Sequence, residues 1–174
     1  MPPLTRFIKQ TLTALALTAL IVPGQAAAQA KETVKATHGD WEIRCSESEG
    51  DLCVMVQVGK TPDGKDSLEI RIRKLKDAKT KDGKPIPAAI QIITPLATIL
   101  RAGVRVKIDA SEPRAAPYEV CVPSGCVVRD VMSEEFLSAL KSGNAASVTY
   151  TMLQRGDVVT NISLKGFTKA FGAL

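Results

Sequence analysis

The residues with the widest choice of chemistry in this sequence are four cysteines: Cys45, Cys53, Cys121 and Cys126. Four cysteines that bind zinc usually come as two C-x2-C pairs, and redox-active pairs as C-x-x-C beside a helix start. Neither spacing is present, because seven residues separate the first two cysteines and four separate the last two. Each pair instead brackets a turn-rich stretch. This favours the disulfides Cys45–Cys53 and Cys121–Cys126 over the two other connectivities that four cysteines allow.

Other residues that could support catalysis are scarce. His38 is the only histidine and stands just ahead of the first expected strand, where we interpret it as solvated. The sequence has no G-x-S-x-G elbow, P-loop, G-x-G-x-x-G or H-E-x-x-H pattern. We therefore predict no catalytic, cofactor-binding or metal-binding residues and no cofactor. The alternative that stays open is a hydrolase of envelope carbohydrate, whose pair of carboxylates would be assembled from distant segments.

A run of basic residues is the most suggestive surface feature, and it spans the end of an expected strand and the loop that follows. Its members are Arg71, Arg73, Lys74, Lys76, Lys79, Lys81 and Lys84. One interpretation is a solvated edge, because acidic residues interrupt the run and lysines often protect strand edges. The other is a candidate docking surface for an anionic partner such as lipopolysaccharide, an acidic polysaccharide or an acidic protein face. No aromatic residues are interleaved with the run, which argues against nucleic-acid binding.

The first thirty residues have the organisation of a secretory signal peptide. Arg6 and Lys9 precede an apolar run, and Ala28-Gln29-Ala30 fits the A-x-A cleavage pattern. The alternative, a retained anchor, needs an apolar run of roughly twenty residues, which is longer than the run present here. We predict cleavage near Ala30, a periplasmic or secreted mature protein, and no integral membrane span. A short linker at residues 31–37 would then lead into a single domain at residues 38–174.

The dominant period of the remaining sequence is two, which is typical of half-buried strands. Alternating or continuous apolar runs predict strands at residues 41–45, 52–58, 68–73, 88–93, 104–108, 148–152 and 158–164, and a hairpin is expected from residues 118–121 and 126–131. One helix is expected between Ser133, a good N-cap, and Gly143, which can end it. A short terminal turn is expected at residues 167–171. Many short strands with one short helix predict an all-β, antiparallel sandwich or barrel.

Five motifs, taken in order, resemble the invasion-associated locus B family of exported bacterial proteins. They are Gly39-Asp40-Trp41-Glu42-Ile43-Arg44-Cys45; Pro95-Leu96 with Gly103-Val104 and Ile108-Asp109; Pro117-Tyr118; Cys121-Val122-Pro123-Ser124-Gly125-Cys126; and Ser163-Leu164-Lys165-Gly166-Phe167. The resemblance covers roughly residues 37–174, which is nearly the whole chain after the expected signal peptide.

The resemblance implies an immunoglobulin-like β-sandwich, a periplasmic or envelope location and, in pathogenic members, a link to host-cell invasion. It implies no catalytic site and no particular ligand. Together with the residues themselves, it predicts a non-enzymatic envelope protein with a role in invasion or envelope maintenance. Such a protein would act by binding another envelope or host protein, or an anionic envelope glycan.

Overall fold

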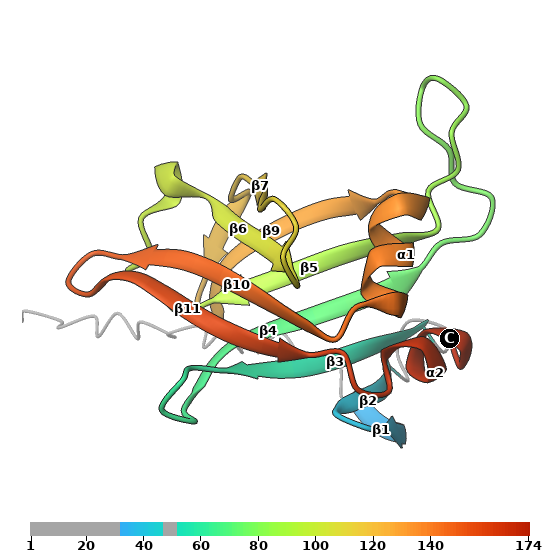
Figure 1. Ribbon diagram of the computed structural model, residues 1–174, viewed down its shortest axis with the longest axis horizontal. Coiled ribbons are helices and arrows are strands. Elements are labelled where there is room, and N and C mark those ends of the chain that lie inside the picture. The colour runs from blue at the N-terminus through green and yellow to red at the C-terminus, as the bar shows by residue number, and fades with distance from the viewer. Residues whose placement is uncertain (1–31, 47–51) are drawn as a thin grey trace, which may run out of the picture.

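The computed structural model describes residues 32–46 and 52–174. The predicted signal peptide, its cleavage near Ala30 and most of the turn between Cys45 and Cys53 lie outside the described residues. Within them, eleven strands form one antiparallel sheet (Figure 1). The strands are β1 Glu32–His38, β2 Trp41–Ser46, β3 Leu52–Lys60, β4 Asp66–Lys74, β5 Ala88–Thr94, β6 Val104–Ile108, β7 Arg114–Ala116, β8 Val120–Val122, β9 Gly125–Met132, β10 Ala145–Met152 and β11 Gly156–Ser163.

The sheet curls so that its two halves face each other as the layers of a sandwich. One layer is β7-β6-β10-β11, and the other is β3-β4-β5-β9-β8, with β2 and β1 added beside β3. The layers join where Asn161 of β11 pairs with Lys60 of β3. They approach again at the opposite edge, where Arg114 of β7 makes an ion pair of 3.0 Å with Asp130 of β9. The all-β, antiparallel sandwich predicted from the sequence is confirmed.

Strand β1 occupies residues that were expected to form a linker. It pairs with β2 from Glu32 opposite Ser46 to His38 opposite Trp41, so the two strands are joined by a two-residue turn at Gly39 and Asp40. Gly39 has a φ of 62°, a conformation that such tight hairpin turns need and that glycine adopts without strain. The prediction of a linker at residues 31–37 is therefore corrected: residues 32–37 belong to β1, because Gly39 and Asp40 form the turn of the β1–β2 hairpin.

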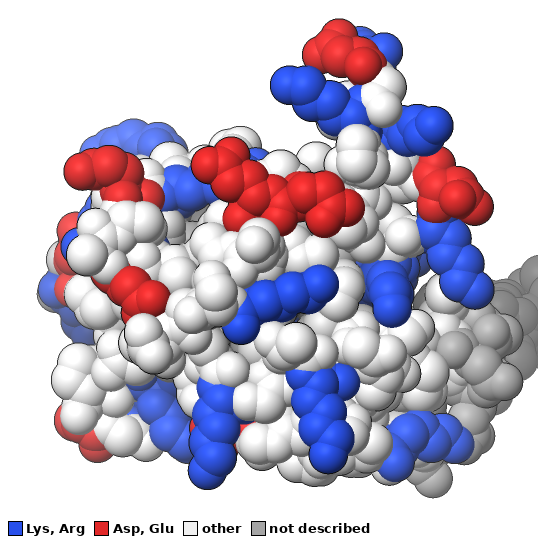
Figure 2. Space-filling view, turned by 45° about the vertical axis from the view of Figure 1, so that its right-hand side comes forward, with Lys and Arg blue, Asp and Glu red and all other residues white. Residues whose placement is uncertain are grey.

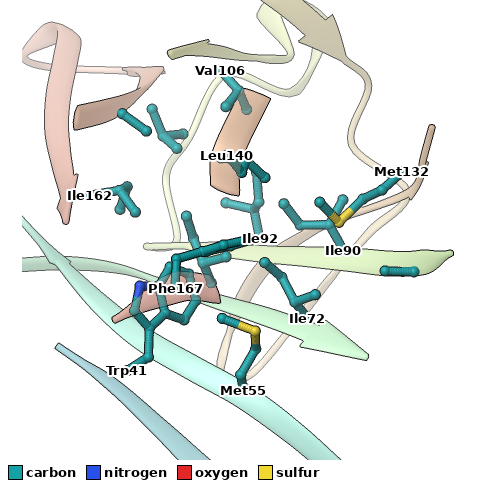
Figure 3. Packing of buried hydrophobic residues seen from close by; sticks show 14 of the residues in the cluster. Trp41, Met55, Ile72, Ile90, Ile92, Val106, Met132, Leu140, Ile162 and Phe167 are labelled. Carbon is teal, nitrogen blue, oxygen red and sulfur yellow. The ribbon is translucent and has the colours of Figure 1, made fainter. Parts of the chain in front are cut away.

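The core fills the space between the layers (Figure 3). Trp41, Met55 and Ile72 enter from the layer of β2, β3 and β4, and Val148 enters from β10; each is at most 1% exposed. The inward positions alternate with outward polar ones along β4, as the period-two pattern predicts. Trp41 therefore belongs to the core.

The predicted helix is α1, Glu134–Ser142. The Ser133 side chain accepts a hydrogen bond of 3.2 Å from the Phe136 backbone N–H, which satisfies one of the free donors of the first turn. Leu137 and Leu140 are buried, and Gly143 follows as the C-cap.

A second helix, α2 (Phe167–Gly172), replaces the turn expected at residues 167–171. Its Phe167 ring packs edge-on against Trp41 at a centroid distance of 5.3 Å, and burial of this ring anchors the helix. Figure 1 shows α1 and α2 at the same end of the sandwich, while the turns β3–β4 and β10–β11 lie at the other end. None of the helices in the described residues is long and apolar enough to cross a bilayer.

The first and last of the family-like motifs meet in space. Gly166 has a φ of 86°, and a Cβ added there would lie 2.1 Å from the carbonyl oxygen of His38. The Asp40 backbone N–H donates a hydrogen bond of 3.1 Å to the Lys165 carbonyl oxygen. These two motifs are therefore structural, because they close the β1–β2 turn onto the segment before α2.

Candidate binding surface

The cysteines form the two predicted disulfides, Cys45–Cys53 and Cys121–Cys126. In each bond the two cysteines lie directly opposite each other in neighbouring strands, β2 and β3 or β8 and β9. No cysteine among the described residues is free. The same residues contain no group of three or more His, Cys, Asp or Glu side chains placed to hold a metal ion. The four cysteines thus form cross-links between neighbouring strands.

The seven basic residues singled out in the sequence are divided by the structure into separate environments. Arg71 and Arg73 alternate with buried Ile72 and lie on the outer face of β4. Arg71 makes ion pairs with Glu69, at 3.0 Å, and with Glu32 of β1. Because its charge is already compensated within the sheet, Arg71 acts mainly as a link between strands.

Lys74 lies apart from both arginines. Its Nζ atom is 5.3 Å from the centre of the Phe171 ring, and the Nζ atom of Lys141 is 4.9 Å from the same ring. The two ammonium groups therefore stabilise α2 through cation–π contacts.

The remaining four lysines stand on a hairpin, residues 75–87, that joins β4 to β5. Backbone hydrogen bonds give this segment a defined shape: the N–H of Leu75 donates to the carbonyl oxygen of Pro87, at 2.9 Å, and that of Ile86 to Ala78, at 2.8 Å. The hairpin extends away from the sandwich at the helix end (Figures 1 and 2). We name this segment the basic hairpin; its lysines are Lys76, Lys79, Lys81 and Lys84.

The basic hairpin carries uncompensated positive charge. All four of its lysines are exposed. Within residues 32–46 and 52–174, none of the four has a carboxylate oxygen within 4.0 Å. Against these four charges the hairpin has two carboxylates, Asp77 and Asp82, so its formal charge is +4 − 2 = +2. These features distinguish the four hairpin lysines from Arg71, which makes ion pairs, and from Lys74, which contacts the Phe171 ring.

A shallow groove of about 650 Å³ lies on the outer face of the sheet next to the hairpin, across β3, β4, β5 and β9. Arg73, Gln91 and Arg129 supply polar groups, while Val54 and Val131 supply apolar ones. Arg73 pairs with Ala89 in the ladder just before the hairpin begins. The groove therefore adjoins the base of the basic hairpin, and we call it the outer-face groove.

Three carboxylates that line other grooves on the surface are engaged by neighbouring side chains. Glu42 pairs with Arg44 at 2.9 Å, and Asp66 pairs with Lys60 at 2.5 Å. Asp40 accepts a hydrogen bond of 2.7 Å from the Ser163 hydroxyl. Each of these three carboxyl groups is thus held by a neighbouring side chain.

Two other carboxyl groups have lowered pKa values, which argues against a role as general acid. A hydrogen bond from Thr61, with Lys65 nearby, lowers the pKa of Asp63 to about 2. A hydrogen bond from Thr151, followed by one from Arg105, lowers the pKa of Asp157. A lowered pKa suits a structural anion rather than a proton donor.

The outer-face groove was not predicted from the sequence. Gln91 and Arg129 are 38 residues apart and become neighbours only because β5 pairs with β9 in the observed register. The only sequence signal is that each polar residue alternates with buried aliphatic neighbours, which places it on the outer face but not beside a particular partner.

The fold and the surface define a class: a disulfide-linked β-sandwich with an extended basic hairpin. Comparisons with known proteins assign the family. The family model for the invasion associated locus B (IalB) protein matches residues 41–174. The chain therefore belongs to the invasion associated locus B family, as the resemblance in its motifs predicts.

Relatives of the chain carry related names. It is 30% identical to the invasion protein B homologue of Brucella abortus over 167 residues, which cover 94% of this chain and 89% of the relative. It is 23% identical to invasion protein B of Bartonella bacilliformis, over 79% of this chain and 73% of the relative. The crystal structure of invasion associated protein B from Bartonella henselae superposes with a TM-score of 0.62 at 20% identity. It covers 81% of this chain and 95% of that one, and so supports the fold.

Proposed function

We propose that this protein is an exported, non-catalytic binding protein that uses the basic hairpin and the adjoining outer-face groove to hold an anionic partner. The partner is an acidic glycan of the bacterial envelope, or an acidic envelope or host protein. Residues 1–30 would direct export and be removed near Ala30, which leaves the protein in the periplasm or releases it. The names of its relatives, invasion protein B and an invasion protein B homologue, support a role in invasion.

The observation that carries the proposal is the state of the four hairpin lysines. They are exposed and have no ion-pair partner among the described residues, whereas Arg71 in the same run is fully engaged. Long-range attraction to an anionic polymer needs such uncompensated charge, and an extended hairpin offers it without steric obstruction. The adjoining groove adds Arg73 and the aliphatic Val131, which suits a partner with both anionic and apolar groups.

The carboxylates favour binding over the alternative, a carbohydrate hydrolase. Asp40, Glu42 and Asp66 each contact a neighbouring hydroxyl or basic side chain. Hydrogen bonds lower the pKa of Asp63 and of Asp157, which suits a fixed anion rather than a general acid.

The test compares two quadruple variants that remove the same charge. One carries Lys76→Gln, Lys79→Gln, Lys81→Gln and Lys84→Gln in the hairpin. The control carries Lys35→Gln, Lys107→Gln, Lys165→Gln and Lys169→Gln, four exposed lysines scattered over other elements. Binding to purified lipopolysaccharide is measured at about 50 mM and about 500 mM salt. Isolated bacterial envelopes are incubated with the wild-type protein to detect any release of sugar.

We expect the hairpin variant to bind at least about tenfold more weakly than the control variant at the lower salt concentration. The wild-type protein should lose most of its binding at the higher salt concentration, because surface charge is screened. Equal binding by the two variants would show that net charge alone, not the hairpin, holds the partner. Release of sugar from the envelopes by the purified protein would favour the hydrolase.

A further inference from the structure

The end of the sandwich opposite the helices carries exposed leucines on two connecting segments. Leu153, in the β10–β11 turn, is 71% exposed, while Leu96 and Leu100, between β5 and β6, are 52% and 46% exposed. A single exposed leucine is common on protein surfaces, but several at one end form a patch that calls for a binding partner. We call these three residues the apolar tip.

The two segments of the apolar tip are fixed to each other. The Leu153 N–H donates a hydrogen bond of 3.0 Å to the Ala97 carbonyl oxygen, and the Ile99 N–H donates one of 2.8 Å to Thr151. These bonds make a short antiparallel bridge between Thr98 and Met152. The leucines are therefore presented by a tied framework, so little conformational entropy would be lost when they are buried.

Basic residues without carboxylate partners accompany the leucines. Arg101 directly follows Leu100, and Arg155 lies two residues after Leu153; both are exposed. In the described part of the chain, no carboxylate lies within 4.0 Å of either guanidinium. These two arginines are free to contact an external anion.

The acidic residues at this end are already neutralised. Asp157 pairs with Arg105 at 2.6 Å. In the neighbouring β3–β4 turn, Asp63 pairs with Lys65 at 2.9 Å. Arg101 and Arg155 therefore leave this end with an excess of positive charge beside its exposed leucines.

We infer that the apolar tip docks on a bilayer leaflet that contains anionic phospholipids. The leucine side chains would enter the boundary between headgroups and acyl chains, while Arg101 and Arg155 would contact phosphate groups. Leucine side chains alone would also suit an apolar protein groove, but the free guanidinium groups on both segments favour a surface that is densely anionic. This inference goes beyond the proposed function and uses the opposite end of the molecule.

The two surfaces are compatible. In Figure 1 the β10–β11 turn and the basic hairpin lie at opposite ends of the long axis. A protein docked through its apolar tip would therefore point the basic hairpin away from the bilayer, where it can reach a second, anionic partner.

The experiment measures cosedimentation of the full mature protein with vesicles of phosphatidylcholine alone, or of phosphatidylcholine and phosphatidylglycerol in equal parts. The tip variant carries Leu96→Ser, Leu100→Ser and Leu153→Ser. Its matched control carries Val34→Ser, Val122→Ser and Val159→Ser, three exposed aliphatic residues on other elements. Two further variants are Arg101→Gln with Arg155→Gln, and the hairpin quadruple lysine variant.

We expect the wild-type protein to bind the anionic vesicles, and the tip variant to bind them roughly 100-fold more weakly. The arginine variant should bind about tenfold more weakly, and the valine and hairpin variants should bind as the wild type does. Should the triple leucine variant unfold, Leu153→Ser alone gives the readout and should weaken binding by about fivefold. Absence of wild-type binding to anionic vesicles, unchanged binding by a folded tip variant, or loss of vesicle binding in the hairpin variant would each overturn the inference.

Discussion

Gln57 and Ser163 exchange two hydrogen bonds across the place where the sheet divides. The Ser163 backbone N–H donates to Oε1 of Gln57 at 2.7 Å, and Nε2 of Gln57 donates to the Ser163 carbonyl oxygen at 3.0 Å. The same amide nitrogen also lies 3.1 Å from the Asp40 carbonyl oxygen. One buried side chain thus continues the ladder between β3 and β11 where the backbones separate, and it joins this ladder to the β1–β2 turn.

Replacement of Gln57 with methionine keeps the volume but removes all three hydrogen bonds. We expect the free energy of unfolding to fall by about 2–4 kcal/mol. The reason is that the Ser163 N–H loses its acceptor in a partly buried place, while the Ser163 carbonyl oxygen keeps the hydrogen bond from the Trp41 indole N–H. Urea unfolding followed by the fluorescence of the single tryptophan, Trp41, measures this change. Gln91→Met, on the outer face of the sheet, is the control and should change stability by less than about 1 kcal/mol. Equal losses in the two variants would refute the role given to Gln57.

The contact between Gly166 and His38 predicts a second stability difference. A Cβ at Gly166 would meet the His38 carbonyl oxygen at 2.1 Å, and the φ of 86° is itself unfavourable for alanine. Gly166→Ala should therefore lower the free energy of unfolding by more than about 2 kcal/mol. A Cβ at Gly172 would meet nothing within 4 Å, so Gly172→Ala should be neutral or slightly stabilising. Thermal denaturation of both variants decides the matter, and a tolerated Gly166→Ala would show that the two segments are free to separate.

Tyr118 predicts how stability changes at alkaline pH. Burial raises the pKa of its phenol above the ordinary value of 10.0, although hydrogen bonds from Thr94 and Thr98 oppose the shift. The folded protein therefore resists ionisation that the unfolded chain undergoes. The stabilisation is complete below pH 10.0 and is lost as the pH rises through the folded pKa. Titration of tyrosinate absorbance should show ionisation above pH 10.0 that disappears in Tyr118→Phe. Ionisation of Tyr118 below that pH would contradict the assignment.

Patterns of short range were predictable from the sequence. Leu68, Ile70 and Ile72 are buried in alternation, as their period-two spacing indicates. The pairing of each cysteine with its near neighbour follows from the turn residues between them, and Ser133 caps its helix as expected. Each of these features depends on residues that are close in the chain, so propensity and spacing suffice.

Features that depend on distant pairing were not predictable. Arg71 was grouped with its neighbours in the chain, but its ion pair with Glu32 exists only because β1 forms and folds back over the sheet. Likewise, Lys74 is separated from the hairpin lysines by its contact with Phe171 of α2. The sequence reveals where basic residues are concentrated, whereas the structure reveals which of them remain uncompensated.

The central claim is that binding of the anionic glycan or protein partner resides in the basic hairpin, for which the sandwich serves as a scaffold. Its most direct test is a variant in which residues 76–86 are replaced by a short Asn-Gly turn, a sequence suited to a tight hairpin. We predict a melting temperature within a few degrees of the wild type, about the effect of 1 kcal/mol or less, and a loss of binding to purified lipopolysaccharide of at least about tenfold. A folded variant that binds lipopolysaccharide as tightly as the wild-type protein would contradict the claim.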